Sequence, residues 1–445
     1  MLPIISTVCD GWTLRSIRTD RFKAGLLSVS ATLPISSETA YLNSLLFSVL
    51  LRGSQRYPSV AALNRRLDEL YGTVLSVRNF YRGDRQILGI SADLLDQSYL
   101  PSEAPQLLDG VLEVLTSVLF HPLTNADGCL NAHYTESEKQ LQCDAIRARK
   151  NQPADYATDR CRDLLYAGEA CAVPIYGTEE EVLSVTPEQL SQYRNVLFPT
   201  LSWDSFYVGP LPHEVVEEAL RRAVPAKEIP AAGKADSGSL PSSAKPRPAS
   251  DTVGGIRRAE EPFPAGQGHL VLGFRTGRDI TSPDFASTVV MNELFGVSPS
   301  SRLFLNVREK LGLCYSCFSS YNSYKGTALV YCGLENDNRV RAEEEIFRQL
   351  DAIRSGDFSE EELSAAKKSL ENAYRQLEDS PAALESFFFG RALVGVRDTP
   401  GDCRAAFAGV TREDVIRAAD AMYCTAVFFL RGAGGEEDTD ADDED

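Results

Sequence analysis

The sequence predicts an α+β fold in which two related domains each pack a mainly antiparallel sheet against helices. Three observations carry this prediction. Apolar residues make up 43% of the 445 residues, which is enough for a sizeable core. A stretch rich in Pro, Ala, Ser and Gly interrupts the chain at about residues 225–264. The segments on its two sides repeat one order of elements, in which hairpins interleave with helices.

The repeat is clearest in two pairs of segments. Residues 67–94 and 307–336 each run through a helix end, an aromatic-rich strand, a hairpin turn and a second strand. Each segment has a glycine after the helix and another in the hairpin, namely Gly72 and Gly83, then Gly312 and Gly326. An amphipathic helix is predicted to follow in each half, over 107–120 and 340–353.

The second pair lies at the end of each half. Thr186 and Thr411 each open a predicted helix that leads into an apolar strand. Ser359 caps another predicted helix, which runs through Arg375. The two pairs are offset by 240 and 225 residues, and a tandem duplication of one α/β domain explains both offsets.

These observations divide the chain into four parts. We expect a first domain over 1–224, a flexible linker over 225–264 and a second domain over 265–432. Residues 433–445 form an acidic tail that is predicted to be disordered.

Composition limits the partners and the compartment. The net charge of −18 disfavours nucleic acid and anionic membranes as partners. The N-terminus lacks a signal-peptide pattern, and no apolar run is long enough to predict a membrane span. Ten scattered cysteines suit reduced thiols better than a disulfide framework. Together these features predict a cytoplasmic protein.

Two long motifs give a family resemblance. The segment SRLFLNVREKLGLCYS (301–316) closely resembles the signature S-R-L-F-x-x-x-R-E-x-x-G-L-x-Y-S in the C-terminal domain of pitrilysin-like (M16, insulinase-like) metallopeptidases. Residues 45–72 resemble their N-terminal signature, in which an H-x-x-E-H helix precedes a basic residue and Gly. A turn at 174–177 and the following VTPEQL match as well. The resemblance implies two M16-type (LuxS/MPP-like) domains.

The family's zinc motif is lost in this chain. Alignment on Arg52-Gly53-Ser54 puts Ser44 and Ser48 at the two histidines of H-x-x-E-H. Phe47 then occupies the position of the general-base glutamate. Zinc hydrolysis needs about three protein ligands and a carboxylate that accepts a proton from the metal-bound water. We therefore expect no metal, no cofactor and no peptide hydrolysis by this chain alone.

The resemblance places the family's third zinc ligand, a glutamate on a later helix, at Glu136 or Glu138. Without its partner ligands, this acid is expected to be an orphan on a helix surface. His133 and Glu136 form an isolated H-x-x-E, which leaves open an unconventional metal enzyme.

A C-x-x-C motif joins Cys314 and Cys317. On a strand, such positions point to opposite faces, so both thiols could grip one metal only if a turn intervened. We interpret these cysteines as small buried hydrophobic residues rather than as redox or zinc residues.

Arg308 and Tyr315 survive from the family's active-site machinery. In the M16 family, an Arg and a Tyr at these positions project from the C-terminal half toward the zinc site, where they hold the substrate backbone and the oxyanion. A fixed cation and a phenolic donor suit that task. In two-subunit family members, one chain carries H-x-x-E-H and its partner carries this pair.

The resulting hypothesis is a non-catalytic subunit of a heterodimeric zinc peptidase. Its partners would be a catalytic M16 subunit with an intact H-x-x-E-H and a peptide substrate, with neither nucleic acid nor membrane. A catalytically silent scaffold or peptide-binding protein of the same fold is the alternative. The N-terminal stretch most resembles a bacterial subgroup labelled as associated with aminopentanol modification of elongation factor P, which leaves a link to translation-factor modification open.

Overall fold

The computed structural model describes residues 2–101, 106–225, 255–264 and 266–433. Its contacts divide the chain into two compact units. Unit 1 contains residues 1–147, 169–243 and 375–401, and unit 2 contains residues 148–168, 244–374 and 402–445. Each unit therefore takes one segment from the opposite side of the predicted linker. The predicted acidic tail lies almost wholly outside the described residues.

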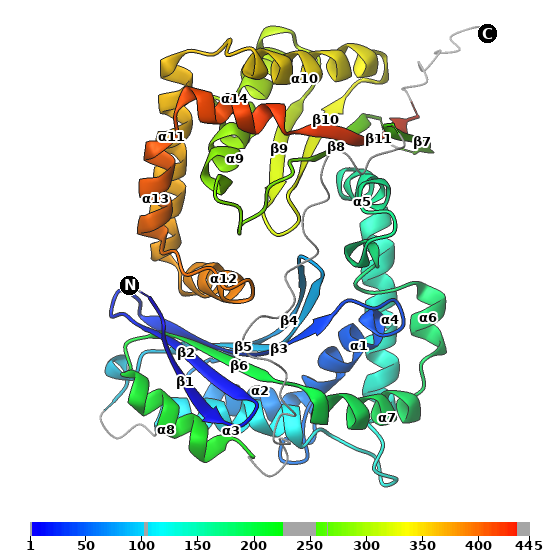
Figure 1. Cartoon of the computed structure of the whole chain (residues 1–445). Helices are drawn as coiled ribbons and strands as arrows, with labels where there is room; N and C mark the ends of the chain where they lie inside the picture. Colours follow the sequence, from blue (N-terminus) through cyan, green and yellow to red (C-terminus); the bar gives the residue numbers. More distant parts are fainter. Residues whose placement is uncertain (1, 102–105, 226–254, 265, 434–445) are drawn as a thin grey trace, which may run out of the picture. The chain divides into compact units, whose positions relative to one another are not determined.

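A six-stranded sheet forms the centre of unit 1, with the order β1-β2-β6-β3-β5-β4 (Figure 1). Only the β2–β6 pair is parallel. The strands are β1 (Ile4–Cys9), β2 (Trp12–Arg18), β3 (Ala24–Pro34), β4 (Val74–Arg82), β5 (Arg85–Leu95) and β6 (Trp203–Gly209).

Helices cover both faces of this sheet. The helices of unit 1 are α1 (Ala40–Leu50), α2 (Val60–Glu69), α3 (Leu107–Phe120), α4 (Ala132–Lys150), α6 (Glu179–Ser184), α7 (Pro187–Leu197), α8 (His213–Ala223) and α12 (Pro381–Ala392). Helices α1 and α3 contact β5, whereas α12 contacts β3 and β6 on the other face (Figure 1). Seven consecutive residues of β3 are buried because both of its faces are covered.

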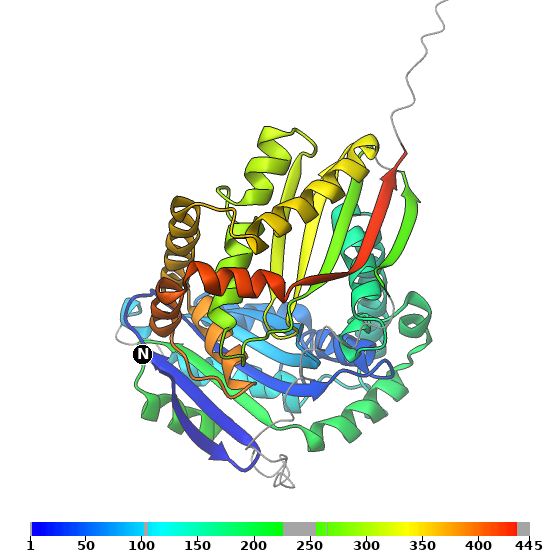
Figure 2. The ribbon, with the colours of Figure 1, turned by 45° about the horizontal axis from the view of Figure 1, so that its top comes forward.

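A five-stranded sheet forms the centre of unit 2, with the order β7-β11-β8-β10-β9. Figure 2 shows these strands side by side. The strands are β7 (Arg257–Phe263), β8 (Gly268–Arg275), β9 (Ser316–Asn322), β10 (Thr327–Leu334) and β11 (Tyr423–Gly432). Only the β7–β11 pair is parallel.

Every residue of β8 is buried, because α5 contacts it on one side and α10 on the other. The helices of unit 2 are α5 (Pro153–Leu165), α9 (Phe285–Asn292), α10 (Arg339–Arg354), α11 (Glu360–Gln376), α13 (Pro400–Gly409) and α14 (Arg412–Asp420). Two π-helical segments, η5 (Glu293–Val297) and η6 (Leu303–Lys310), precede β9.

The two sheets confirm the predicted α+β fold of two related halves. The series β2-β6-β3-β5-β4 and β7-β11-β8-β10-β9 have the same order, the same single parallel pair and the same sequence of strands along the chain. The paired glycines agree as well. Gly72 and Gly312 have φ of 73° and 60°, and Gly83 and Gly326 have φ of 58° and 60°, a region that favours glycine.

One part of the linker prediction is wrong. Residues 257–263 lie within the predicted linker, yet they form β7 at the edge of the second sheet. Backbone pairing with β11 stabilises this strand although its sequence, RRAEEPF, is charged and contains a proline. Proline is tolerated on an edge strand. Residues 226–254 of the predicted linker lie outside the described residues.

Candidate functional site

The positions that the sequence alignment placed at H-x-x-E-H lie on α1, and the first of them belongs to a buried polar network. Ser44 is 2% exposed. Its hydroxyl lies 3.0 Å from the carbonyl oxygen of Ala40 and 2.6 Å from that of Ile175. The side-chain amide of Asn79, on β4, donates to the Ser44 Oγ at 2.7 Å. Ser44 therefore links α1, the edge strand β4 and the turn at residue 175.

The network continues along the sheet. Gln86 donates to the side-chain oxygen of Asn79 at 2.9 Å and accepts from the amide of Asn43 at 2.9 Å. The hydroxyl of Tyr193 donates to Asn43 at 2.6 Å. Asn43 and Gln86 are buried, so these bonds replace the hydration that both amides lose on folding. The surroundings of Ser44 thus consist of neutral amides and hydroxyls that satisfy one another.

The general-base position is filled by an apolar anchor. Phe47 is fully buried, and its ring stacks on that of Phe198 with centroids 6.2 Å apart and an interplanar angle of 28°. Phe198 belongs in turn to an aromatic cluster with Phe120 and Trp203. The third position, Ser48, is half-buried on α1. An aromatic ring cannot accept a proton from water, so this position contributes packing rather than acid–base chemistry.

The candidates for the third ligand differ from the expected orphan acid. Glu138 is 5% exposed and forms an ion pair with Arg52, which follows α1. Glu136 is more exposed and pairs with Lys139 at 3.0 Å. The expectation of a solvated, unpaired carboxylate is therefore wrong for Glu138. The charge of Glu138 is neutralised by Arg52, the residue on which the motif was aligned.

Two of the four histidines have clear neighbours. His213 is buried between the hydroxyls of Ser16 and Ser6, at 2.7 and 3.0 Å. His133 is exposed on α4, and its ring lies 5.4 Å from that of Tyr134 at an interplanar angle of 49°. Among the described residues, three groups of side chains could hold a metal ion, and none of them contains a histidine or Glu136.

Arg308 and Tyr315 lie on either side of the turn between η6 and β9, in unit 2. Tyr315 is 52% exposed, so it does not merely fill the sheet. Its hydroxyl donates to a carboxylate oxygen of Glu335 at 2.7 Å. The guanidinium of Arg308 lies 4.7 Å from the ring centroid of Phe304, and its Nε lies 3.4 Å from Glu309. Both functional groups are thus exposed to solvent, and each contacts a neighbouring side chain.

The local backbone explains how one turn presents both groups. The carbonyl of Arg308 accepts from the amide of Gly312, whose φ of 60° reverses the chain after η6. The amide of Tyr315 then donates to the carbonyl of Gly333 at 2.8 Å, which ties the turn to β10. π-Helical turns are rare and frequently accompany functional sites. The hydrogen bond to Glu335 raises the pKa of Tyr315, whose phenol is protonated at neutral pH even without this shift.

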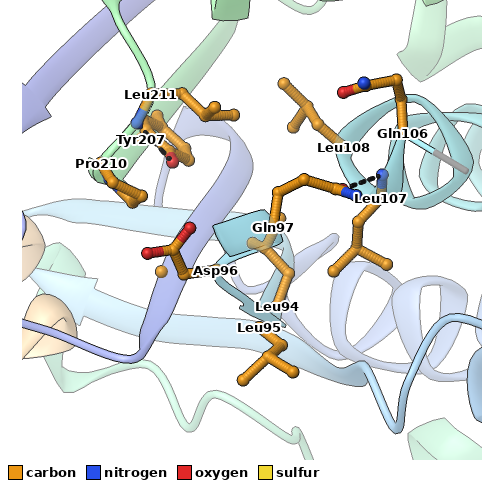
Figure 3. Close-up of a pocket in the computed structure, with 11 residues that line it drawn as sticks. Leu94, Leu95, Asp96, Gln97, Gln106, Leu107, Leu108, Tyr207, Pro210 and Leu211 are labelled. Carbon is orange, nitrogen blue, oxygen red and sulfur yellow. Dashed lines mark hydrogen bonds between the residues drawn. The ribbon is translucent and has the colours of Figure 1, made fainter. Parts of the chain in front are cut away.

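A separate hollow in unit 1 involves other residues. It has a volume of about 340 Å³, is open to solvent and lies where β3 and β5 meet the start of α3 (Figure 3). Five of its eleven lining residues are leucines. Two of its polar side chains have partners within the protein, because Gln97 accepts from the amide of Leu107 at 2.9 Å and the Tyr207 hydroxyl accepts from that of Leu211 at 3.3 Å.

Comparisons with known proteins agree with the fold. Residues 166–370 match the family model described as the peptidase M16 inactive domain. The chain is 28% identical over 425 residues to the probable inactive metalloprotease YmfF of Bacillus subtilis. This alignment covers 96% of this chain and 97% of YmfF. It is 25% identical over 264 residues to the uncharacterized zinc protease YmxG of the same organism, covering 59% of each.

Solved structures share the fold over the whole chain. A conserved protein from Enterococcus faecalis V583 matches with a TM-score of 0.86 and 24% identity, covering 98% of this chain and 100% of its own. A peptidase M16 inactive domain from Pseudomonas fluorescens matches with a TM-score of 0.76 and 16% identity, covering 97% and 98%. The chain is thus similar to M16 peptidase-type proteins, among them a probable inactive metalloprotease and an uncharacterized zinc protease. The described residues include no helix that is long and apolar enough to cross a membrane.

Proposed function

We propose that this M16 peptidase-like chain is the non-catalytic subunit of a heterodimeric zinc peptidase of the cytoplasm. Its partner is a catalytic M16 subunit with an intact H-x-x-E-H, and its ligand is a peptide. The observation that carries the proposal is a contrast between two places in the chain. Arg308 and Tyr315 are exposed at one turn, whereas Ser44 and Phe47 are buried in structural contacts.

The chemistry of the pair supports this role. Peptide hydrolysis develops negative charge on the carbonyl oxygen, and donors held in place for that charge lower the barrier. Arg308 supplies a permanent cation whose position is restrained by the ring of Phe304. Tyr315 supplies a phenol, which is neutral and can donate a hydrogen bond at ordinary pH. Engagement with an oxyanion requires the phenolic hydrogen to turn away from Glu335.

Charge suggests the substrate class. The net charge of −18 gives the protein a negative potential that favours basic peptides over acidic ones. We also propose that the chain belongs to the inactive-partner subgroup labelled by its association with aminopentanol modification of elongation factor P. The support is the resemblance of the N-terminal stretch, and a direct contact with a translation factor is not part of the proposal.

The experiment is a kinetic comparison in the reconstituted heterodimer. The tagged chain is purified from its native cytoplasm, and a co-purifying protein of similar size with an intact H-x-x-E-H is identified by mass spectrometry. Peptide turnover by that complex is then measured with Arg308→Ala and Tyr315→Phe. Each variant is expected to lower kcat by about 100-fold, the usual effect of removing one oxyanion donor.

Matched controls separate this role from general effects on the surface. Tyr99→Phe removes another exposed phenol, and Arg341→Ala removes another exposed cation. Both control complexes should turn over peptide at the wild-type rate. Unchanged kcat in the Arg308 and Tyr315 variants, in complexes that still form, would refute the assisting role.

A silent scaffold is the second candidate function. The observation that favours it is the conversion of the zinc-motif positions into a closed hydrogen-bond network and an aromatic cluster. A scaffold predicts that the chain binds peptide or a partner while Arg308→Ala leaves turnover unchanged. Recovery of the chain with unrelated proteins only would also favour the scaffold.

A further inference from the structure

Three cysteines converge next to the turn that carries Tyr315. Cys314 precedes β9 rather than lying on it, so the alternation of strand faces does not separate it from Cys317. The interpretation of this C-x-x-C as two thiols on opposite faces is therefore wrong. Cys332 lies on β10 directly opposite Cys317 in the antiparallel register. The three Sγ atoms all lie within 4.8 Å of one another.

The three thiols differ in exposure in a way that suits an ion-binding site. Cys317 is 3% exposed and Cys332 is fully buried, so these two form the floor. Cys314 is only half-buried and opens the cluster toward solvent. An ion could reach the two buried sulfurs past Cys314 without displacing the sheet.

The positive charge of Arg308 lies near the Cys314 sulfur. A thiolate, rather than a thiol, is the form of cysteine that ligates metals.

We propose that Cys314, Cys317 and Cys332 form a site for one thiophilic metal ion, of the chemistry shared by Zn²⁺ and Cu⁺. Metal–sulfur bonds of about 2.3 Å place three ligating sulfurs roughly 4 Å apart, within the separation seen here. Soft thiolate ligands select these ions over Mg²⁺ or Ca²⁺.

The charges around the site are consistent with such an ion. Three thiolates and one divalent cation leave one negative charge, which the nearby Arg308 offsets. Each ligation step replaces a sulfur–hydrogen bond with a sulfur–metal bond and releases the proton to water. The bound ion would join β9, β10 and the turn before Tyr315, and this site is separate from the degenerate motif on α1.

The test titrates the full-length, reduced and metal-stripped chain with Cd²⁺, a thiophilic probe, and follows the sulfur-to-cadmium charge-transfer absorption. Native mass spectrometry counts the ions bound. We expect one Cd²⁺ per chain, displaced by Zn²⁺ or by Cu⁺, and the ion that competes at the lower concentration is the one that the site binds more tightly. Cys314→Ser should weaken binding by at least about 10-fold, since loss of even an outer-shell partner costs that much.

Cys314→Ser is the decisive variant, because its half-buried position should tolerate the change. Cys9→Ser and Cys403→Ala are the matched controls, one half-buried and one buried, and both should bind Cd²⁺ like the wild type. Cys317→Ala and Cys332→Ala should abolish binding if circular dichroism shows that they fold. A reduced wild-type chain that binds no stoichiometric Cd²⁺, or a Cys314→Ser variant that binds it equally well, overturns the proposal. Binding that appears only after a disulfide is reduced supports it.

Discussion

At the scale of single residues, the positions that align with the H-x-x-E-H motif make structural contacts. Ser44 bonds to groups from three segments, and Phe47 packs within the aromatic cluster. A histidine at position 44 would have to displace the Asn79 amide, and a glutamate at position 47 would be a buried carboxylate. Restoration of the zinc site would therefore require changes well beyond the three motif positions.

Phe47→Ala should lower the free energy of unfolding of unit 1 by about 3–5 kcal/mol, because it removes a fully buried ring and leaves a cavity. Tryptophan fluorescence during urea unfolding measures this cost. Both tryptophans of the chain, Trp12 and Trp203, lie in unit 1, so the signal reports on that unit.

Tyr99→Ala serves as the control for Phe47→Ala. Its ring is 57% exposed, and the cost should stay below about 1 kcal/mol. A loss of less than 1 kcal/mol in Phe47→Ala would contradict the packing of that ring.

At the scale of elements, α12 is held on the sheet of unit 1 by a buried ion pair. Glu385, on α12, accepts from Arg78 of β4 at 2.8 Å and from the Ser28 hydroxyl of β3 at 3.1 Å. The side chains of Arg78 and Glu385 are 11% and 2% exposed. The ring of Phe389 also lies 5.7 Å from the Arg78 guanidinium. Two charges in such a place are stable only as a pair.

Glu385→Ala should destabilise unit 1 by about 3–5 kcal/mol, because it leaves the buried cation of Arg78 without compensation. The double change Arg78→Met with Glu385→Leu should recover most of that loss. Urea unfolding followed by tryptophan fluorescence measures both.

The exposed pair Arg21–Glu378 provides the matched control, since it also joins residues 375–401 to the N-terminal part of unit 1. Glu378→Ala should cost less than about 1 kcal/mol. An equal effect of the two glutamate substitutions would mean that burial does not decide the strength of this contact.

At the scale of the whole molecule, the two halves of the chain exchange helices. Helix α5 comes from the N-terminal half yet packs on β8 and β11 of unit 2. Helix α12 comes from the C-terminal half yet packs on β3 and β6 of unit 1. The two helices occupy equivalent places, because β3 corresponds to β8 and β6 to β11 in the duplicated sheets. Neither half of the sequence therefore contains a complete unit.

This exchange predicts how fragments behave. Residues 1–225 expressed alone should be unstable, because β3 loses the cover of α12 and Arg78 loses its counter-ion. Co-expression with residues 255–445 should restore a complex that co-purifies through a tag on either fragment. Deletion of residues 381–392 from the second fragment removes α12 and should leave unit 1 unstable. If residues 1–225 alone form a stable monomer whose urea unfolding, followed by tryptophan fluorescence, matches that of the full chain, the exchange of helices is not needed for the stability of unit 1.

Local sequence determined a large part of this protein. The predicted helix at 107–120 coincides with α3, and the helices capped by Thr186, Ser359 and Thr411 begin where expected. Capping bonds and positive-φ turns involve residues at most a few positions apart, so the chain specifies them locally. The loss of H-x-x-E-H could also be read directly, since it depends on the identity of three residues.

Only the tertiary structure decided the features that depend on distant pairing. Strand β7 forms because β11, more than 160 positions later, offers a free edge, and its own charged sequence predicts no strand. Cys332 lies beside Cys314 and Cys317 because of the register between β9 and β10. The C-x-x-C spacing gives no information about that register. The exchange of α5 and α12 likewise depends on which sheet each helix packs against. The apolar pattern of a helix shows that one face is buried, but it does not show which distant sheet covers that face.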